Sequence, residues 1–365
     1  MFNYGNIYKQ LDKCCAGFWT PKKVLTYNKP VIVITGSRSV GKSTGVAVLC
    51  LLDFIKNNHK FMYVRRRQTD TQKTCKTFFS NAIQIINKKS DYNITGFKYY
   101  CGKYYIQLED DTENWLECGS ATPLSMEEEL KSSVFSDYFT IIYDEFISKN
   151  ANKYLGTKAN PDFEWDSVVS LYQTIDRGVD RPYRNETVIF LLGNKSTIYN
   201  PICLSLGIAD YVQKGAHFTS PKDKIWIWED VDKVEAVKEI EKSFAYQMSS
   251  DSVKKYAYEN EGSDTEYFIK KPKVYKYFIT FKLKGEGYGV YIDKERNFYI
   301  GYPRTDYSYI SLDVDSHDGN DLHLVNNWRN DPFLKLVTDA YTKGRLYFFN
   351  GKIQSAILKY LEFTK

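Results

Sequence analysis

The sequence contains no C-x-x-C pair, no low-complexity tract and no apolar run long enough to cross a bilayer. Its seven cysteines are an odd number, and the adjacent Cys14 and Cys15 cannot easily bridge each other. A disulfide scaffold and a zinc ribbon are therefore not expected, and a reducing cytoplasm fits the chain. The longest apolar run, residues 46–55, is interrupted by Asp53, and the first residues lack the basic-then-apolar order of a secretory signal. Neither a membrane nor export is expected.

What the chain does have is length and aromatic content. Its 365 residues are 43% hydrophobic and include 31 Tyr and 22 Phe. This is enough for a substantial core and for two domains, and it argues against disorder. The net charge of +5 arises within the first 200 residues. Such a mild excess permits nucleic-acid binding but does not demonstrate it.

Apolar runs and helical patterns alternate through the first 205 residues. Strands are predicted at 29–35, 60–64, 104–108, 140–143 and 187–192, and helices at 45–56 and 71–87. This alternation is typical of a parallel sheet covered on both faces. The pattern predicts an α/β domain over residues 1–205.

The pattern changes after residue 205. Residues 225–243 carry Glu, Lys and Val at helical spacing, which predicts a helical linker over 206–264. Strands with period-two alternation follow at 275–283, 289–292 and 297–302. A further strand at 345–349, a turn at Asn350-Gly351 and a helix at 354–363 end the chain. These elements predict a separate α+β domain over residues 265–365.

One loop matches the pattern G-x-x-x-x-G-K-[ST] and lies between a predicted buried strand and a predicted helix. In such a P-loop the glycines let backbone N–H groups surround phosphates, and the lysine reaches the β- and γ-phosphates. Ser43 would hold Mg²⁺. The alternative is a chance Gly-Lys-Ser turn after a strand, but the strand-loop-helix context favours a site for ATP and Mg²⁺. Its residues are Gly36, Ser37, Arg38, Ser39, Val40, Gly41, Lys42, Ser43 and Thr44.

Two later strands also end in polar side chains. The predicted strand at 140–143 is followed by Asp144 and Glu145. Asp144 would orient Mg²⁺ and Glu145 would polarise the attacking water as general base. Two acids at a strand end can also simply cap the next helix, but a P-loop upstream favours catalysis. Asn194 ends the third such strand and could sense the γ-phosphate, or serve only as a turn former.

These three pieces, in this order, resemble the ATPases that package DNA into phage heads, and most closely the short ATPases of small short-tailed, protein-primed phages. The resemblance covers most of residues 30–205. It rests on GSRSVGKST, FMYVRRR at 61–67, SSVFSDYFTIIYDEF at 132–146, and SLYQTIDRG followed by VIFLLGN and Asn200-Pro201. It implies an additional-strand ATPase that forms a homo-oligomeric ring, a pentamer, and works with double-stranded DNA and the phage portal or connector. The implied location is the host cell cytoplasm, transiently at the procapsid vertex.

The resemblance also implies a positive charge supplied by a neighbouring subunit. Arg177, in TIDRG, matches the trans-acting arginine, with Arg181 and Arg184 as nearby competitors. Lys131 matches a second basic position. For Arg177 and Lys131 alike, the alternative is a solvated surface charge.

Three adjacent arginines, Arg65, Arg66 and Arg67, follow the predicted strand at 60–64. They could bind DNA in a ring pore, help to position the nucleotide, or be solvated, and the sequence does not separate these roles.

In terminases the second domain is an RNase H-like nuclease, which needs acids on separate strands to hold two metals. The first strand here, YKYFITFKL, has no acid at that place, Lys282 and Lys284 stand nearby, and Asp293 alone cannot make a two-metal site. The resemblance therefore implies a vestigial nuclease domain that grips DNA or the portal. A solvated loop is favoured over a metal site for one acidic cluster: Asp313, Asp315, His317, Asp318, Asp321 and His323.

The function expected is ATP-driven translocation of viral double-stranded DNA into a preformed capsid. Three rivals remain. An active terminase would also cut DNA, a nucleotide-controlled assembly switch would bind without processive motion, and a helicase would separate strands. The missing strand acid argues against the first, the Asp144-Glu145 pair argues against the second, and no helicase motif set is identified for the third.

Overall fold

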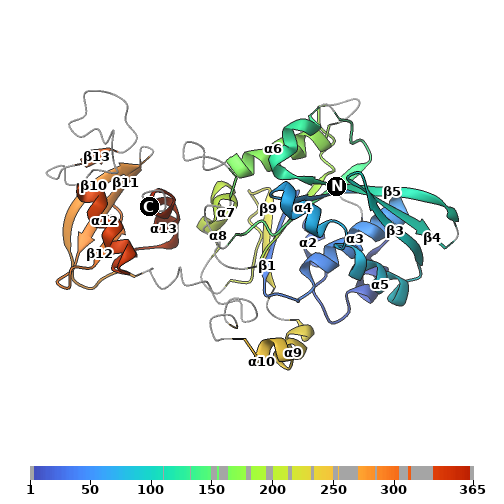
Figure 1. Cartoon of the computed structure of the whole chain (residues 1–365), viewed down its shortest axis with the longest axis horizontal. Coiled ribbons are helices and arrows are strands. Elements are labelled where there is room, and N and C mark those ends of the chain that lie inside the picture. Colours follow the sequence, from blue (N-terminus) through green and yellow to red (C-terminus); the bar gives the residue numbers. More distant parts are fainter. Residues whose placement is uncertain are drawn as a thin grey trace. The chain divides into compact units, whose positions relative to one another are not determined.

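Short β-branched and aromatic runs form the strands of this chain, because such side chains pack well on a pleated surface. The computed structural model describes residues 4–109, 111–131, 133–148, 154–155, 163–177, 182–194, 200–212, 216–231, 234–249, 254, 270–283, 286–303, 311–313 and 332–361. The chain divides into two compact units, Met1–Glu261 and Gly262–Lys365, which are described one at a time (Figure 1).

The first unit begins with two short helices and then alternates strands and helices. Its elements are α1 Tyr8–Cys14, α2 Lys22–Leu25, β1 Val31–Gly36, α3 Lys42–Asn57, β2 Lys60–Arg65, α4 Gln68–Thr74, α5 Ser80–Lys89, β3 Ile94–Tyr100, β4 Lys103–Leu108, β5 Asp111–Pro123, the 3₁₀ helix η1 Leu124–Leu130, β6 Tyr138–Asp144, α6 Phe163–Ile175, β7 Val188–Leu192, α7 Pro201–Ser205, α8 Ile208–Tyr211, β8 Phe218–Thr219, β9 Trp226–Val231, α9 Glu235–Glu241 and α10 Phe244–Gln247.

Within the described residues, these strands form one nine-stranded sheet in the order β3-β4-β5-β2-β6-β7-β1-β9-β8. Neighbours from β5 to β9 are parallel. The prediction of a parallel sheet is therefore confirmed for its centre. The two margins are antiparallel: β3, β4 and β5 pair in sequence on one side, and β8 pairs with β9 on the other. The predicted strand at 104–108 is β4, within the antiparallel margin.

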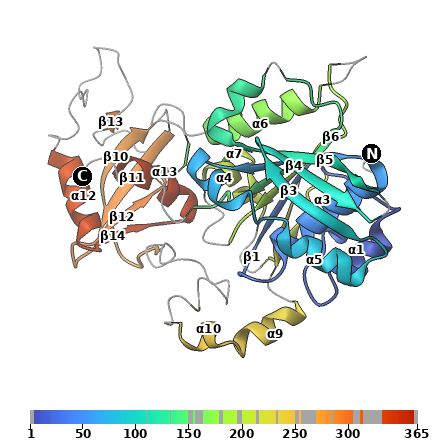
Figure 2. The same ribbon diagram turned by 45° about the vertical axis from the view of Figure 1, so that its right-hand side comes forward.

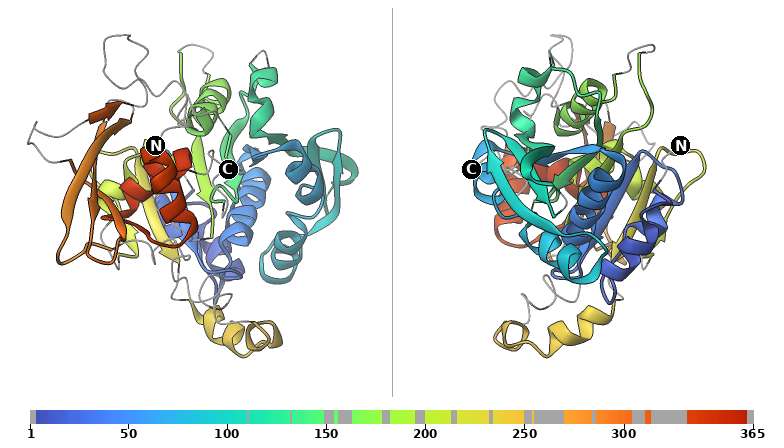
Figure 3. Two further views of the ribbon diagram at one scale, coloured as in Figure 1. Left: turned by 60° about the vertical axis from the view of Figure 1, so that its left-hand side comes forward. Right: turned by 90° about the vertical axis from the view of Figure 1, so that its right-hand side faces the viewer.

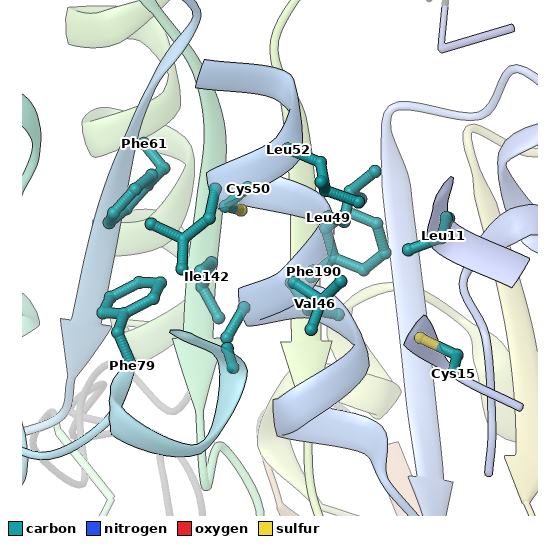
Figure 4. Close-up of a cluster of buried hydrophobic side chains, with 14 of the residues drawn as sticks. Leu11, Cys15, Val46, Leu49, Cys50, Leu52, Phe61, Phe79, Ile142 and Phe190 are labelled. Atoms are coloured by element: carbon teal, nitrogen blue, oxygen red, sulfur yellow. The ribbon is translucent and has the colours of Figure 1, made fainter. Parts of the chain in front are cut away.

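Helices cover both faces of this sheet, as the buried apolar strands predict. Alternate residues of β1 enter different cores: Ile32 and Ile34 pack on the face that α3 covers, and Val31 and Val33 pack on the face that α6 covers (Figure 2). In Figure 4, side chains of α3, including Val46, lie among strand residues and Leu11 of α1.

Two sequence predictions in this unit are wrong. Residues 226–231 are not part of a helical linker, because β9 pairs with β1 over six residues and belongs to the main sheet. In the parts of 206–264 that the structure describes, the helices are α8, α9 and α10, and the strand β8 precedes β9. The predicted helix at 71–87 is instead two helices, α4 and α5, separated at residues 75–79.

In the residues that the structure describes, the second unit is a five-stranded sheet with helices packed on one face (Figure 3). The predicted strands, turn and terminal helix are present with small shifts in their ends, whereas a strand at Ser311–Asp313 and a helix at Pro332–Thr342 were not predicted. The elements are β10 Lys276–Leu283, β11 Glu286–Ile292, β12 Phe298–Gly301, β13 Ser311–Asp313, α12 Pro332–Thr342, β14 Leu346–Phe348 and α13 Gly351–Leu361. Their order in the sheet is β13-β10-β11-β12-β14. The α/β fold followed by a smaller α+β unit is confirmed.

None of the helices in the described ranges combines the length and apolar character needed to cross a bilayer.

Candidate nucleotide-binding site

Two glycines shape the loop between β1 and α3. Gly36 has φ 144° and Gly41 has φ 96°, both in the region that favours glycine. A Cβ on Gly36 would lie 2.3 Å from the Val231 carbonyl oxygen of β9. Gly41 is the residue that precedes the first turn of α3. The glycines of the sequence motif are thus required by backbone conformation and by close packing against β9.

Lys42 is buried at the first position of α3. Its ammonium donates to the Gly36 carbonyl at 2.9 Å and also to the Ser37 carbonyl. Burial lowers the pKa of Lys42 to about 8, and the carboxylates of Asp144 and Asp230 act in the opposite direction. The lysine therefore has negatively charged neighbours on both sides of β1.

Ser43 and Asp144 meet across the gap between the loop and β6. The Ser43 hydroxyl donates to Asp144 Oδ1 at 3.1 Å, and the Tyr63 hydroxyl donates to Asp144 Oδ2 at 3.2 Å. Burial raises the pKa of Asp144, and the guanidinium of Arg65 opposes this shift. These contacts join residues that lie about a hundred positions apart in the sequence.

Arg65 faces both acids at the end of β6. Its Nη1 donates to Asp144 Oδ2 at 3.0 Å and its Nη2 donates to Glu145 Oε2 at 2.6 Å. Glu145 has φ 55°, and its side chain is 63% exposed. Of the three roles open to Arg65, these contacts favour positioning within the site. Arg67, by contrast, is exposed to solvent.

Arg66 points into the protein and forms a buried ion pair with Glu164 of α6. The guanidinium donates to Glu164 Oε2 at 2.9 Å and to the Phe146 carbonyl at 2.6 Å. The Tyr143 hydroxyl and the Leu155 amide also donate to Glu164. Sequence reasoning did not identify Glu164, because nothing local marks an acid at a helix start as buried. The network joins β2, β6 and α6 directly behind the two acids.

Replacing Glu164 with Ala is expected to lower the free energy of unfolding by about 3–5 kcal/mol, because Arg66 stays buried without its partner. Urea denaturation of the full chain measures this loss. Glu239→Ala, which removes an exposed partner of Lys242, serves as the control and should change the unfolding midpoint little. Equal midpoints for the two variants would contradict the inferred role of the buried pair.

The strand register brings the predicted site residues together. Pairing of Tyr143 with Leu191 and of Ile34 with Leu192 aligns the carboxyl ends of β6, β7 and β1 at one edge of the sheet. A cleft of about 270 Å³ opens there. It is lined by Arg38, Ser39, Gly41, Lys42, Ser43, Thr44, Asp144, Glu145, Leu192, Gly193 and Asn194.

Lys131 and Arg177 lie elsewhere in the first unit. Arg177 Nη1 donates to the Lys131 carbonyl at 3.0 Å, and both side chains reach the surface. Arg184, by contrast, donates from one guanidinium nitrogen to the Tyr138 carbonyl at 2.6 Å and to the Ile175 carbonyl at 2.9 Å. These contacts place the end of α6 beside the start of β6, at the sheet edge opposite the cleft. Arg181 lies outside the described residues.

The remaining predicted sites lie in the second unit. Lys284 and the acidic cluster are outside the described residues, except that the Asp313 backbone pairs with Lys282 between β13 and β10. Asp293 accepts hydrogen bonds from Asn297 and Tyr299, which lower its pKa although burial acts in the opposite direction. Across the described ranges, no group of three or more His, Cys, Asp or Glu side chains is placed to hold a metal.

The parallel sheet, the loop with its buried lysine, and the serine of α3 that faces an acid at the end of β6 define a P-loop protein of the α/β class. The chain belongs to the Podovirus DNA encapsidation protein (Gp16) family, whose model matches residues 11–365. It is 25% identical over 346 residues to the DNA packaging protein of Bacillus phage phi29, covering 93% of this chain and 95% of that protein.

Solved structures of phage DNA packaging motors share the fold. The bacteriophage Phi-29 viral genome packaging motor assembly matches with a TM-score of 0.69 at 21% identity, covering 96% of this chain and all of that chain. The Phi-28 gp11 DNA packaging motor matches with a TM-score of 0.59 at 18% identity, covering 95% and 96%. The expected resemblance to phage packaging ATPases is confirmed at the level of family and fold.

Proposed function

We propose that this chain hydrolyses ATP with Mg²⁺ and uses the reaction to move double-stranded DNA into a preformed capsid. The work would take place in the host cytoplasm, at the procapsid vertex. The observation that carries the proposal is the 3.1 Å approach of Ser43 to Asp144 in a cleft that Lys42 and Glu145 also line. Membership of a DNA encapsidation family supports the choice of DNA as cargo.

The loop and the start of α3 would bind the triphosphate. Lys42 now directs its ammonium to two carbonyl oxygens of its own loop. A phosphate offers a stronger, charge-assisted acceptor at the same place. The backbone N–H groups of the loop and the amino-terminal end of α3 add favourable electrostatics for an anion.

The Ser43 hydroxyl and the Asp144 carboxylate fit a magnesium ion, because both are oxygen donors of the kind that Mg²⁺ prefers and they already lie side by side. Bound there, Mg²⁺ would neutralise charge on the phosphates. Asp144 must be ionised for this role, and the adjacent Arg65 favours the ionised carboxylate.

Glu145 would act as the general base that removes a proton from the attacking water. Its exposed side chain lies at the cleft, and Arg65 holds one of its carboxylate oxygens. Because the same guanidinium contacts both acids, Arg65 would orient Glu145 relative to the phosphate site. Asn194 lines the cleft from β7 and would contact the γ-phosphate or the water.

Arg177 would act on the site of a neighbouring subunit. It lies near the start of β6, whereas Glu145 follows the end of that strand. Seven strand residues span roughly 20 Å, so Arg177 cannot reach the cleft of its own chain. The Arg184 guanidinium is held by carbonyls of its own chain, which favours Arg177 over Arg184 as the trans-acting group. Lys131 contacts Arg177 and would support it. A homo-oligomeric ring, a pentamer by resemblance, would supply the neighbour.

The second unit would grip DNA or the portal without cutting DNA. In the segments that the structure describes, β10 carries no acid, and Asp293 is engaged by its own turn. Lys282 lies on β10, near the place where a two-metal nuclease would need a carboxylate. This arrangement supports a vestigial nuclease-like domain.

The motor is tested by measuring ATP turnover of purified protein over a range of protein concentrations, with and without double-stranded DNA. Turnover per molecule is expected to rise with concentration and with DNA, because each site needs a neighbour's arginine. Slow turnover that depends neither on protein concentration nor on DNA would support an assembly switch instead. Metal-dependent cleavage of plasmid DNA in the same samples would support an active terminase.

A further inference from the structure

The segment between α1 and α2 lies directly against the phosphate loop. The Trp19 amide donates to the Val40 carbonyl at 3.0 Å. A Cβ on Gly41 would lie 2.8 Å from Phe18 Cβ, and one on Gly45 would lie 3.0 Å from the Trp19 carbonyl oxygen. The segment therefore touches the loop and the first turn of α3 at two glycines. A Cβ on Gly41 would overlap Phe18, and a Cβ on Gly45 would make an unusually close contact with Trp19.

The two neighbouring aromatic residues of this segment, Phe18 and Trp19, differ in solvent exposure. Trp19 is only 5% exposed, and its indole N–H donates to Glu229 of β9 at 2.8 Å. Phe18 is 47% exposed, although its Cβ is held against Gly41. Trp19 thus anchors the segment, and the Phe18 ring is presented to solvent beside the loop. A half-exposed phenyl ring at a fixed position is suited to stack on a flat ligand.

The residues that line the cleft determine the orientation of a bound triphosphate, and hence which part of the nucleotide would lie against the Phe18 ring. Glu145 and Asn194 lie on the side of β6 and β7, so the γ-phosphate must point that way for a water near Glu145 to attack it. The opposite end of the triphosphate must then leave the cleft on the other side, past Gly41 and Thr44. Successive helix residues are 100° apart, so Gly41 and Gly45 share a face of α3 and Thr44 lies next to it. This is the face on which Phe18 and Trp19 pack.

We propose that the Phe18 ring is the surface on which the base of the bound nucleoside triphosphate stacks. This inference rests on the proposed function, because it takes the cleft as the triphosphate site. Stacking of a base on an aromatic side chain tolerates different bases, since every base has a π-face. Phe18 would therefore strengthen binding of the nucleotide without by itself selecting adenine.

The test compares two ligands in the full-length chain with Mg²⁺: the non-hydrolysable ATP analogue AMP-PNP and inorganic tripolyphosphate, which has no base. Phe18→Ala keeps the Cβ that contacts Gly41 and removes only the ring. This variant is expected to bind AMP-PNP about tenfold more weakly, as measured by calorimetry. Its affinity for tripolyphosphate should be unchanged. Phe18→Tyr should keep the affinity of both. Tyr27→Ala removes a similarly exposed ring just before β1, at the opposite edge of the sheet, and should change neither.

The outcomes separate the two proposals. Equal weakening of both ligands in Phe18→Ala would overturn the stacking role and show that the ring only supports the loop. If Phe18→Ala bound AMP-PNP as tightly as the unmodified chain, the base would not stack on Phe18 and the proposal would be wrong. If the unmodified chain bound neither ligand, or if Lys42→Ala bound both as well as the unmodified chain, the cleft would not be the triphosphate site. In that case the proposed function would fail first, and the stacking proposal with it.

Discussion

Replacing Glu145 with Gln is expected to lower ATP turnover by about 10²–10⁴-fold, the usual contribution of a positioned general base. Gln keeps the size of the side chain but cannot accept a proton from water. Ser43, Lys42 and Asp144 are untouched, so ATP should still bind with nearly unchanged affinity. The expected result is a variant that holds ATP and does not hydrolyse it.

Single-turnover hydrolysis and equilibrium binding of AMP-PNP, measured on the same sample, check this expectation. Glu113→Gln is the control, because it changes an exposed acid in the antiparallel margin of the sheet. Its turnover should equal that of the unmodified chain. If Glu145→Gln kept more than a tenth of the turnover, another group would have to be the base.

Replacing Arg177 with Ala is expected to lower the turnover of the assembled protein by about 10³–10⁵-fold, the effect seen when an arginine finger is missing from a phosphate-transfer site. The side chain is exposed and makes a single described hydrogen bond, to a backbone carbonyl. Its loss should therefore leave the fold and the binding of ATP intact. Lys88→Ala, at an exposed position in the last turn of α5, should have no effect.

Mixing the two inactive variants distinguishes action in trans from action in cis. A subunit with Arg177→Ala keeps its own Glu145, and a Glu145→Gln neighbour still offers Arg177. Mixed assemblies are expected to regain part of the turnover that neither variant has alone. No recovery at any mixing ratio, in samples shown to form mixed assemblies, would contradict a trans-acting Arg177.

Much of the fold could be read from the sequence because its signals are local. The strands β1, β6 and β7 are mainly apolar runs. β1 ends at Gly36, β6 ends at Asp144, and Gly193 follows the last residue of β7. The segment WIWEDV of β9 was misread because it contains two acids, Glu229 and Asp230, and a charged helix follows it, so a helical period dominated the window. The antiparallel margin was missed because exposed residues interrupt the apolar pattern of β3, and because the first half of β5 is polar and exposed.

The residues of the candidate site also fall into those that a local motif predicts and those that only the fold brings together. The loop from Gly36 to Thr44 and the Asp144-Glu145 pair follow from motifs whose residues are close in sequence. Arg65 was recognised as a basic residue but not assigned a role. Its contact with the two acids depends on β2 lying beside β6, with Val64 opposite Tyr143. Strand order is set by the packing of the whole sheet, and no local pattern reports it.

The sequence by itself determined that a strand, a glycine loop and a helix follow one another in the order typical of a phosphate site, because the motif specifies the glycines and the lysine. It also determined that two acids end a later buried strand. The tertiary structure alone decided that Arg65 bridges those acids, that Arg66 is buried against Glu164, and that Phe18 lies on the loop. Each of these contacts joins segments distant in the sequence, and only the alignment of parallel strand ends at one sheet edge brings them within hydrogen-bonding or van der Waals distance.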